Sequence, residues 1–294
     1  MQIIFILCFL WFISSGNSIL LNLKSFAGGE MKAGETVMGK DEAFSEKELT
    51  RYQRQIIIPD IGESGQKKIK AARIFVAGAG GLGSISSYYL AAAGVGELRI
   101  VDRDTVEMTN LNRQIIHSTP DIGMPKVLSA KKKLEALNPH CAVRPIQTEM
   151  NKENIVDLVG DCSIIVDATD NIETRKALNY ASLQKGLPFI YGGVNKFDGM
   201  MTTFIPGKTP CFECLFSGIE SPKSTIGVIG PLPGVVGSLQ AMEAIKIVLG
   251  MDGMLTGRLL FISASDMTFR EIKVEKNSDC EVCKQPESAA KSVI

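Results

Sequence analysis

The stretch RIFVAGAGGLGSISSYYLAAAG, residues 73–94, decides the fold. Its opening RIFVA has the composition of a buried strand, and residues 84–94 have that of a helix. Between them lies GAGGLG, residues 78–83, whose glycines permit a tight turn and a close approach of the backbone to a ligand. A strand, a glycine turn and a helix in this order predict the first unit of a nucleotide-binding α/β fold.

The same alternation continues on both sides of this stretch. We expect strands at residues 73–77, 97–102, 143–147, 163–168 and 188–193, and helices at residues 46–54, 84–94, 125–139 and 173–186. Helical segments between successive strands imply parallel pairing through right-handed crossovers. After Gly193, the segments DGMMTTFIPG, RLLFISASD and TFREIKVEK predict antiparallel strands around a helix at 238–250. The expected class is α/β: a Rossmann-like, mostly parallel sheet with helices on both faces, extended by C-terminal antiparallel strands.

The composition is that of an ordinary folded protein. The 294 residues include 32 basic and 32 acidic side chains, so the formal net charge is zero, and 45% of the residues are hydrophobic. This hydrophobic share argues against disorder. A nucleic-acid-binding protein uses a basic surplus to displace counterions, so the charge balance argues against nucleic acid as a partner.

The amino terminus is the one compositional anomaly. Residues 3–13, IIFILCFLWFI, are apolar without interruption, but no Lys or Arg precedes them and the run is too short to span a bilayer. We favour a start codon placed too far upstream, with Met31 or Met38 as the true start, over a signal peptide or membrane anchor. We therefore expect a leader and polar lead-in over residues 1–45, one folded domain over 46–284 and a flexible tail over 285–294.

The glycine turn and the acid after the next strand predict a nucleotide site. Gly78 permits the tight turn, Gly80 lets backbone N–H groups approach a phosphate, and Gly83 lets the helix pack closely on the strand. Asp102 ends the following strand, where its carboxylate could accept a hydrogen bond from a ribose hydroxyl. A nicotinamide-dependent dehydrogenase would show the same features, so they do not define the chemistry.

Positive charge after the second strand narrows the choice. Asn110, Arg113 and Lys126 are expected to line the carboxyl edge of the sheet beside the glycine turn. A triphosphate attacked at phosphorus needs cations where charge develops, more than a bound dinucleotide does. Thr169 and Asp170 end a later strand, where Asp170 could hold Mg²⁺. Taken singly, Arg113 and Lys126 could equally be solvated surface charges.

Several motifs together identify a family. They are RYQRQI (51–56), GAGGLG (78–83), VDRDTVEMTNLNRQ (101–114), GMPK (123–126), TDN (169–171) and GSLQAMEAIK (237–246). Over about residues 46–284 the chain resembles the MoeB/ThiF/HesA-like adenylyltransferases, relatives of ubiquitin-activating enzymes. The resemblance implies a homodimeric enzyme that binds ATP at the glycine turn. It further implies a substrate: the C-terminal Gly-Gly carboxylate of a small ubiquitin-like sulfur-carrier protein, which is converted to an acyl-adenylate with release of pyrophosphate.

The resemblance also implies roles for single residues. Gly81 would contact ATP, Asp102 would bind its ribose, and Arg54 would reach across the dimer interface to the phosphates of the neighbouring site. No general base is required, because the attacking carboxylate is already ionised at neutral pH. The other implied roles are phosphate contacts by Asn110 and Arg113, stabilisation of transition-state charge by Lys126, and magnesium binding by Asp170.

Four of the seven cysteines form two Cys-x-x-Cys pairs, which predict a structural zinc site. Cys211 and Cys214 form the first pair, and Cys280 and Cys283 form the second; the family resemblance implies a zinc of this type. Unrelated reduced thiols or a redox dithiol are the alternatives. The remaining cysteines are Cys8 in the leader, and Cys141 and Cys162, which are most simply core residues.

Many relatives carry a further cysteine in the crossover loop that can link covalently to the carrier. Here the corresponding segment, residues 217–234, has none, and Lys223 or Ser224 stands roughly where it would fall. We therefore expect an adenylation step only, with sulfur supplied by a separate donor.

Three other functions stay open at this stage. One is an adenylating relative that acts on tRNA or a small molecule, which the cysteine pairs disfavour. Another is a nicotinamide-dependent oxidoreductase, which the cation cluster disfavours, and the third is a non-catalytic scaffold. The pathway served is open between molybdopterin, thiamine and another sulfur transfer. An enzyme that uses ATP and carries reduced thiolates is expected in the cytoplasm, with membrane anchoring or secretion as a minor alternative.

Overall fold

The structure is a computed structural model that describes residues 44–221 and 227–284. The expectations for residues 1–43 of the leader and lead-in, for Lys223 and Ser224, and for the tail at 285–294 lie outside the described residues. The boundaries predicted for the three parts of the chain therefore stay predictions.

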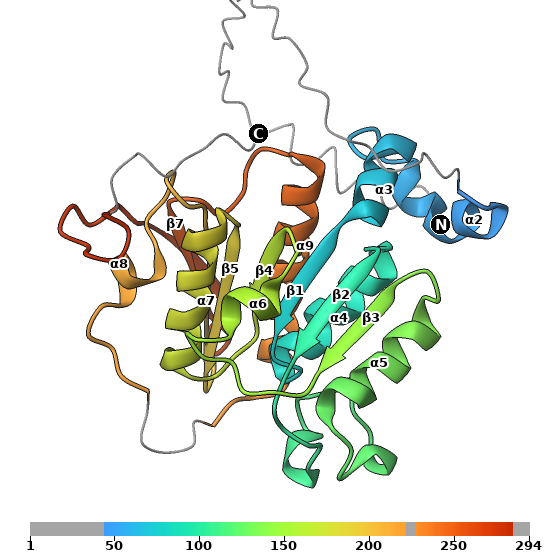
Figure 1. Ribbon diagram of the computed structural model, residues 1–294, viewed down its shortest axis with the longest axis horizontal. Coiled ribbons are helices and arrows are strands. Elements are labelled where there is room, and N and C mark those ends of the chain that lie inside the picture. Colours follow the sequence, from blue (N-terminus) through green and yellow to red (C-terminus); the bar gives the residue numbers. More distant parts are fainter. Residues whose placement is uncertain (1–43, 222–226, 285–294) are drawn as a thin grey trace, which may run out of the picture. The chain divides into compact units, whose positions relative to one another are not determined.

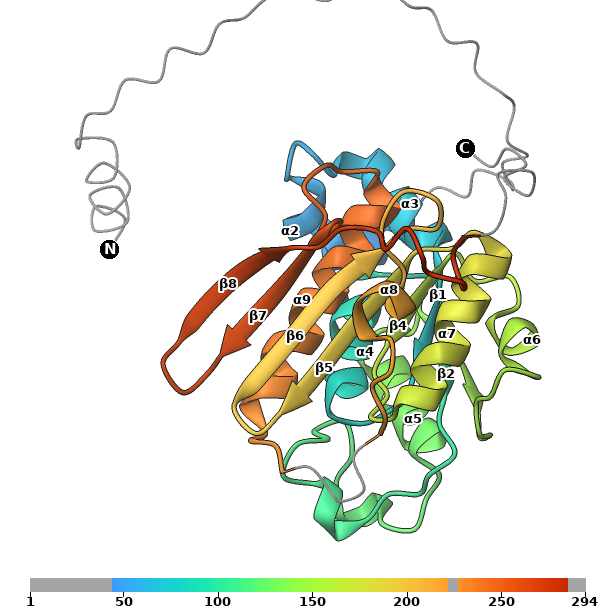
Figure 2. The ribbon, with the colours of Figure 1, turned by 90° about the vertical axis from the view of Figure 1, so that its left-hand side faces the viewer.

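One eight-stranded sheet organises the described residues, with the strand order β3-β2-β1-β4-β5-β6-β7-β8 (Figure 1). The first five strands pair in parallel, and β5 to β8 pair antiparallel, so the predicted topology is confirmed. Figure 2 shows the antiparallel strands continuing the sheet beyond β5. The strands are β1 (Arg73–Ala77), β2 (Glu97–Val101), β3 (Ala142–Ile146), β4 (Ile164–Asp167), β5 (Phe189–Asn195), β6 (Asp198–Phe204), β7 (Arg258–Ser263) and β8 (Thr268–Lys273).

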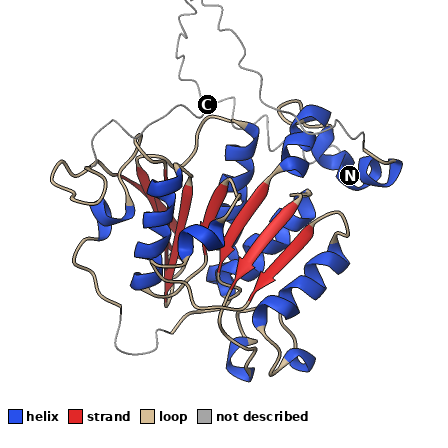
Figure 3. Ribbon diagram, in the orientation of Figure 1, coloured by secondary structure: helices blue, strands red, loops and turns tan. Residues whose placement is uncertain are grey.

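Helices cover both faces of the sheet, as predicted (Figure 3). All residues of strand β1 after the first are buried, because alternate side chains pack into two different hydrophobic cores, one on each face of the sheet. Ile74 and Val76 pack with α4 (Gly81–Ala93), α5 (Lys126–Leu137) and α9 (Pro231–Leu249). Phe75 and Ala77 pack with the helices of the other face: α6 (Ile155–Val159), α7 (Ile172–Lys185) and α8 (Phe212–Phe216).

Two helices differ from the prediction. Helix α2 (Glu46–Ile56) begins as predicted, with Ser45 and Glu48 forming a capping box, but α3 (Gly62–Ala71) was not expected. Helix α9 begins at Pro231, ahead of the predicted residue 238. The prolines and glycine of PLPG suggest a loop, yet proline is favoured in the first helical turn, where N–H groups have no partner within the helix.

Helix α9 is also long and apolar enough to meet the length and hydropathy criteria for a membrane span. Half of its most apolar window is buried inside the protein, and it packs against α4 and β5. A core helix meets the same criteria, so these two properties do not indicate a membrane span.

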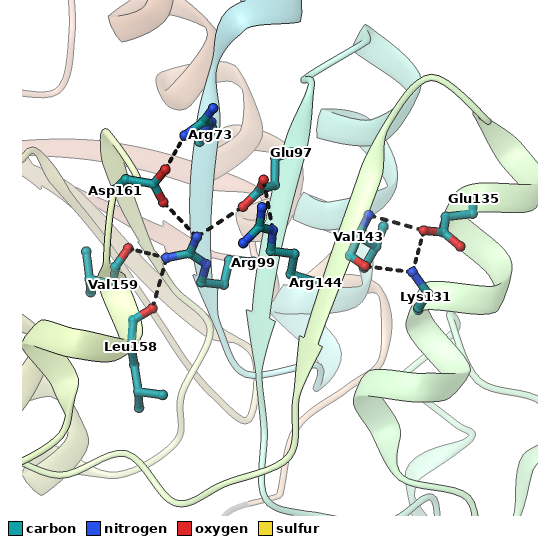
Figure 4. A network of polar contacts seen from close by, with 10 residues as sticks. All are labelled: Arg73, Glu97, Arg99, Lys131, Glu135, Val143, Arg144, Leu158, Val159 and Asp161. Carbon is teal, nitrogen blue, oxygen red and sulfur yellow. Dashed lines mark hydrogen bonds and ion pairs between the residues drawn. The ribbon is translucent and has the colours of Figure 1, made fainter.

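A network of ion pairs on β2 was not predicted from the sequence (Figure 4). The Arg99 guanidinium donates to Glu97 Oε1 at 3.2 Å, to Asp161 Oδ1 at 2.7 Å and to the carbonyl oxygen of Val159 at 2.9 Å. Asp161 also pairs with Arg73. Arg99 is only 7% exposed, so the network satisfies a buried charge and fastens the end of α6 to the sheet.

Candidate active site

A cleft lies along the carboxyl edge of the parallel strands and has a volume of about 1520 Å³. The chain leaves β1 toward one side of the sheet and β4 toward the other, and ligands of open α/β sheets bind at such a switch point. The cleft brings together most of the nucleotide-binding residues expected from the sequence: Gly78, Gly80, Gly81, Asp102, Arg113, Lys126, Thr169 and Asp170.

The glycine turn is packed so closely that side chains are excluded at two positions. Gly78 has φ +98°, and a Cβ there would lie 2.6 Å from the carbonyl oxygen of Ala168. A Cβ at Gly83 would lie 2.0 Å from the carbonyl oxygen of Gly78, so Gly83 serves helix–strand packing and does not line the cleft. Gly80 precedes α4, whose first turn has no side-chain cap. The backbone N–H groups of this first turn are therefore available to an anion.

Asp102 follows β2 and is 9% exposed. Its Oδ2 accepts a hydrogen bond from the Ala79 N–H and its Oδ1 accepts one from the Asp104 N–H, both at 2.8 Å. The carboxylate thus holds the glycine turn to the next loop. Each carboxylate oxygen has a second lone pair, so the orientation fixed by these bonds is compatible with the predicted ribose contact.

The cations lie on the loop after β2 and on the helix that follows. Arg113 Nη1 donates to the carbonyl oxygen of Thr109 at 2.8 Å and to Asn112 Oδ1 at 3.1 Å, both on its own loop. Lys126 begins α5 and is 5% exposed, and its Nζ lies 2.9 Å from Asp104 Oδ2. Asp104 has a half-exposed side chain, so the Lys126 charge is neutralised at the edge of the cleft.

Two expected phosphate ligands are not on the cleft wall. Asn110 Oδ1 accepts a hydrogen bond from the Glu107 N–H at 3.0 Å, so its amide closes a turn in the loop that carries Arg113. Arg54 is an exposed residue of α2 and does not line the cleft of its own chain. Its expected reach into the site of a second copy stays a prediction.

The loop after β4 places Thr169 and Asp170. Thr169 is buried and donates its N–H and its hydroxyl to Asp167 Oδ1, at 2.9 and 2.6 Å. Asp170 is exposed and lines the cleft, where a carboxylate oxygen is available to a cation. Arg175 braces this loop from α7: its Nε lies 3.1 Å from Asp167 Oδ2 and its Nη2 donates to the carbonyl oxygen of Thr169 at 2.7 Å.

The described part of the crossover loop contacts the same helix end. Ser221 Oγ accepts a hydrogen bond from the Ile172 N–H at 2.8 Å and donates one to Glu173 Oε2 at 2.7 Å. The bond from Ile172 satisfies one free N–H group at the start of α7 and holds the loop next to Asp170.

The four paired cysteines form one cluster, whose sulfur atoms all lie within 4.8 Å of one another. The Cys211 sulfur is 3.8 Å from those of Cys214 and Cys280, and the Cys214 sulfur is 3.4 Å from that of Cys283. Tetrahedral zinc with Zn–S bonds of about 2.3 Å requires sulfur separations of ~3.8 Å, so the cluster could bind a metal such as zinc.

Contacts around the cluster agree with a structural role. Asn179 of α7 accepts a hydrogen bond from the Phe212 N–H at 3.1 Å and thereby holds α8, which carries the first cysteine pair.

Cys141 and Cys162 are buried core residues, as predicted. Burial raises the pKa of the Cys141 thiol to about 12 and that of Cys162 to about 11.

His117 and Arg175 also hold the site in place, although no motif predicted them. His117 is buried between the glycine turn and α5, and the partly buried Arg175 lies against the Thr169–Asp170 loop. A basic residue shortly after TDN and a histidine shortly after NRQ were the available signals.

Together, the switch-point cleft, the glycine turn and the acid after β2 define a Rossmann-like nucleotide-binding protein. The chain belongs to the ThiF family, whose sequence model matches residues 52–282.

Relatives of known function share most of the chain. It is 44% identical over 241 residues to the SAMP-activating enzyme E1 of Haloferax volcanii, covering 80% of this chain and 89% of that protein. It is 41% identical over 250 residues to the sulfur carrier protein adenylyltransferase of Thermus thermophilus, covering 82% and 92%. It is 42% identical over 252 residues to adenylyltransferase and sulfurtransferase MOCS3 of Culex quinquefasciatus. This match covers 84% of this chain but only 58% of the relative.

A solved structure has the same fold. The structure of E. coli MccB with ATP superposes with a TM-score of 0.70 at 25% identity, covering 79% of this chain and 74% of that one.

Proposed function

We propose that this protein uses ATP to adenylate the C-terminal glycine of a small ubiquitin-like sulfur-carrier protein ending in Gly-Gly. The observation that carries the proposal is the single cleft that combines the glycine turn with Asp102, Arg113, Lys126 and Asp170. The names of the relatives support the substrate class, since two of them activate SAMP and a sulfur carrier protein.

The reaction needs positioning and charge stabilisation. An oxygen of the glycine carboxylate attacks the α-phosphorus of ATP, the new C–O–P linkage forms, and the bond from that phosphorus to the bridging oxygen of pyrophosphate breaks. Lys126 and Arg113 are placed to stabilise the negative charge of the transition state. Asp170 would hold Mg²⁺, which would neutralise phosphate charge.

The decisive experiment is carrier-dependent exchange of labelled pyrophosphate into ATP, with mass spectrometry of the acyl-adenylate. Candidate carriers of the molybdopterin and thiamine types are compared with variants that lack the final glycine. Formation of the adenylate with an intact carrier alone supports the proposal. Exchange that requires no carrier, or that occurs with tRNA or a small acid instead, contradicts the proposed substrate.

We propose in addition that two copies form a homodimer in which Arg54 of one copy serves the site of the other. Large apolar side chains are exposed on the adjacent helices α4 and α9, among them Tyr89 at 57% and Met242 at 56%. Mixing inactive Arg54→Ala and Arg113→Ala chains tests this arrangement. Random pairing of subunits should leave about a quarter of the sites intact, whereas sites built from single chains would give no recovery.

The cysteine cluster would hold a structural zinc, which stabilises the fold when bound. Metal analysis should give about one zinc per chain, and Cys280→Ser should lower that content while Cys141→Ser, which changes a core thiol, should not. Equal metal content in both variants would contradict the assignment.

A separate donor would supply sulfur, because residues 217–234 contain no cysteine. The cytoplasm provides both ATP and the reducing conditions that keep thiols free. Fractionation of cells with an antibody to residues within 46–284 tests this location.

A further inference from the structure

His117 connects three segments of the candidate site. Its Nε2 lies 2.9 Å from the carbonyl oxygen of Ala79 in the glycine turn, and its Nδ1 lies 2.9 Å from Ser129 Oγ in α5. The loop that holds His117 also carries Arg113, and Ser129 lies one helical turn after Lys126. One imidazole therefore contacts or belongs to every segment that presents phosphate-binding groups on this side of the cleft.

The partners define the tautomer of the ring. A carbonyl oxygen only accepts hydrogen bonds, so Nε2 must carry a proton and donate to Ala79. Nδ1 of the neutral ring then accepts a hydrogen bond from the Ser129 hydroxyl. His117 is 5% exposed, and burial lowers its pKa; the bond to Ala79 opposes this effect, and the Lys126 and Lys133 charges add to it.

Ala79 is fixed from the other side as well. Its N–H donates to Asp102 Oδ2 at 2.8 Å, while its carbonyl oxygen accepts from His117. The peptide unit that starts at the Ala79 carbonyl ends at the Gly80 nitrogen, so this bond sets the direction of the Gly80 N–H. Asp102 and His117 together hold the turn from both ends of one residue.

We propose that His117 is a positioning residue for the nucleotide. By holding the Ala79 carbonyl, it aims the backbone N–H groups of Gly80 and Gly81 at the phosphates and keeps them in register with Arg113 and Lys126. The inference rests on the proposed function, because it assigns a role within the same site. His117 itself neither contacts the substrate nor transfers a proton.

Two substitutions separate the bonds made by the ring. In His117→Gln, the longer side chain can place an amide N–H near the position of Nε2 and donate to Ala79. In His117→Asn, the shorter amide can reach Ser129 but not Ala79. The control is His140→Asn, which changes the only other histidine of the sequence, a partly exposed one.

We expect the Kd for ATP, measured by calorimetry, to rise about five- to tenfold in His117→Asn, the loss expected for one hydrogen bond. His117→Gln should recover most of this loss, and His140→Asn should match the wild type. The KM for the carrier should be unchanged in all three variants. Ser129→Ala, which leaves the bond to Ala79 intact, should have a smaller effect than His117→Asn.

A lower melting temperature in His117→Asn with an unchanged Kd for ATP would show a purely structural role and overturn the inference. A His117→Gln variant that binds ATP no better than His117→Asn would overturn it too. If His117→Asn does not fold, the Kd for ATP of His117→Gln and of Ser129→Ala tests the inference instead. Both variants keep a donor to Ala79, and the inference requires Ser129→Ala to bind ATP nearly as well as the wild type. Failure of the wild-type protein to bind ATP would instead refute the proposed function.

Discussion

Two groups of charges beside the same sheet bind their partners in different ways. In the network on β2, Arg99 is buried and donates to two carboxylates and to backbone carbonyl oxygens (Figure 4). In the cleft, the partners of Arg113 within residues 44–221 and 227–284 all lie on its own loop, and Lys126 has a half-exposed partner. A buried cation held by several acceptors of the fold stabilises it, whereas a cation with donors left over is available to a ligand. The two groups should therefore respond differently to mutation.

Loss of a cleft charge should produce the largest effect, and on activity alone. We expect Arg113→Ala and Asp170→Ala each to lower kcat/KM for pyrophosphate exchange by about 10²- to 10³-fold, because each removes a charge that acts in the transition state. The melting temperature should stay near that of the wild type. Arg270→Ala, which removes an exposed arginine of β8, is the matched control. Exchange that persists in both cleft variants would refute the residue assignment.

Loss of the network arginine should act on stability alone. Arg99→Ala leaves the buried Glu97 carboxylate with the more exposed Arg144 as its partner and removes the guanidinium that holds the end of α6, so we expect the free energy of unfolding in urea to fall by about 3 kcal/mol. Activity per folded molecule should be unchanged. Arg144→Ala removes the more exposed partner of Glu97 and should cost less than about 1 kcal/mol. Equal losses in the two variants would mean that burial does not distinguish these arginines.

A smaller change tests how closely the network is packed. Gly160 has φ +55°, and a Cβ there would lie 2.1 Å from Arg99 Nη1. Gly160→Ala should therefore cost about 2 kcal/mol, the strain of a left-handed conformation together with displacement of the guanidinium. Gly186→Ala has φ +68° and ψ 26°, an αL conformation with open space around an added Cβ, so it measures the strain of that conformation alone. The difference between the two variants in urea unfolding measures the contact with Arg99 together with the additional strain of ψ −121° at Gly160.

The thiol beside the network predicts a weak alkaline effect. Burial raises the pKa of Cys162 to about 11 from an ordinary value of 9.0. Stability is then complete below pH 9 and falls as the pH rises toward 11, because the unfolded chain loses its thiol proton first. We expect Cys162 to contribute a loss on the order of 1 kcal/mol at pH 10, so Cys162→Ala should lose less stability at this pH than the wild type does, while the similar contribution of Cys141 should remain. Alkylation of Cys162 at pH 8 should require urea.

The sequence predicted what depends on local pattern and known motifs. The strands, the glycine turn and the cysteine pairs each occupy a short segment, so their composition was sufficient to place them. The pairing of Arg99 with Asp161 joins residues that are 62 positions apart in the chain, and no local pattern predicts it. For the same reason the bond from His117 to Ala79 was missed, since it depends on how a loop folds back over the turn.

The error at the start of α9 has a different cause. PLPG at the start of α9 resembles a loop, but tertiary packing holds it in a helix beside the cleft.

Asn110 was expected on a phosphate, and its motif gave no sign that the amide closes its own loop. A motif shows which residues occur together in a family, but not which of them contact each other in the unbound protein.

The contact between Gly83 and the carbonyl oxygen of Gly78 limits how this enzyme could diversify. Every substitution of glycine adds at least a Cβ, so no substitution of Gly83 should be neutral. Gly234, in α9 next to the cleft residue Pro233, has an ordinary φ and nothing within 4 Å of an added Cβ. A laboratory selection for new substrates should therefore accumulate changes at Gly234 and leave the glycine turn unaltered.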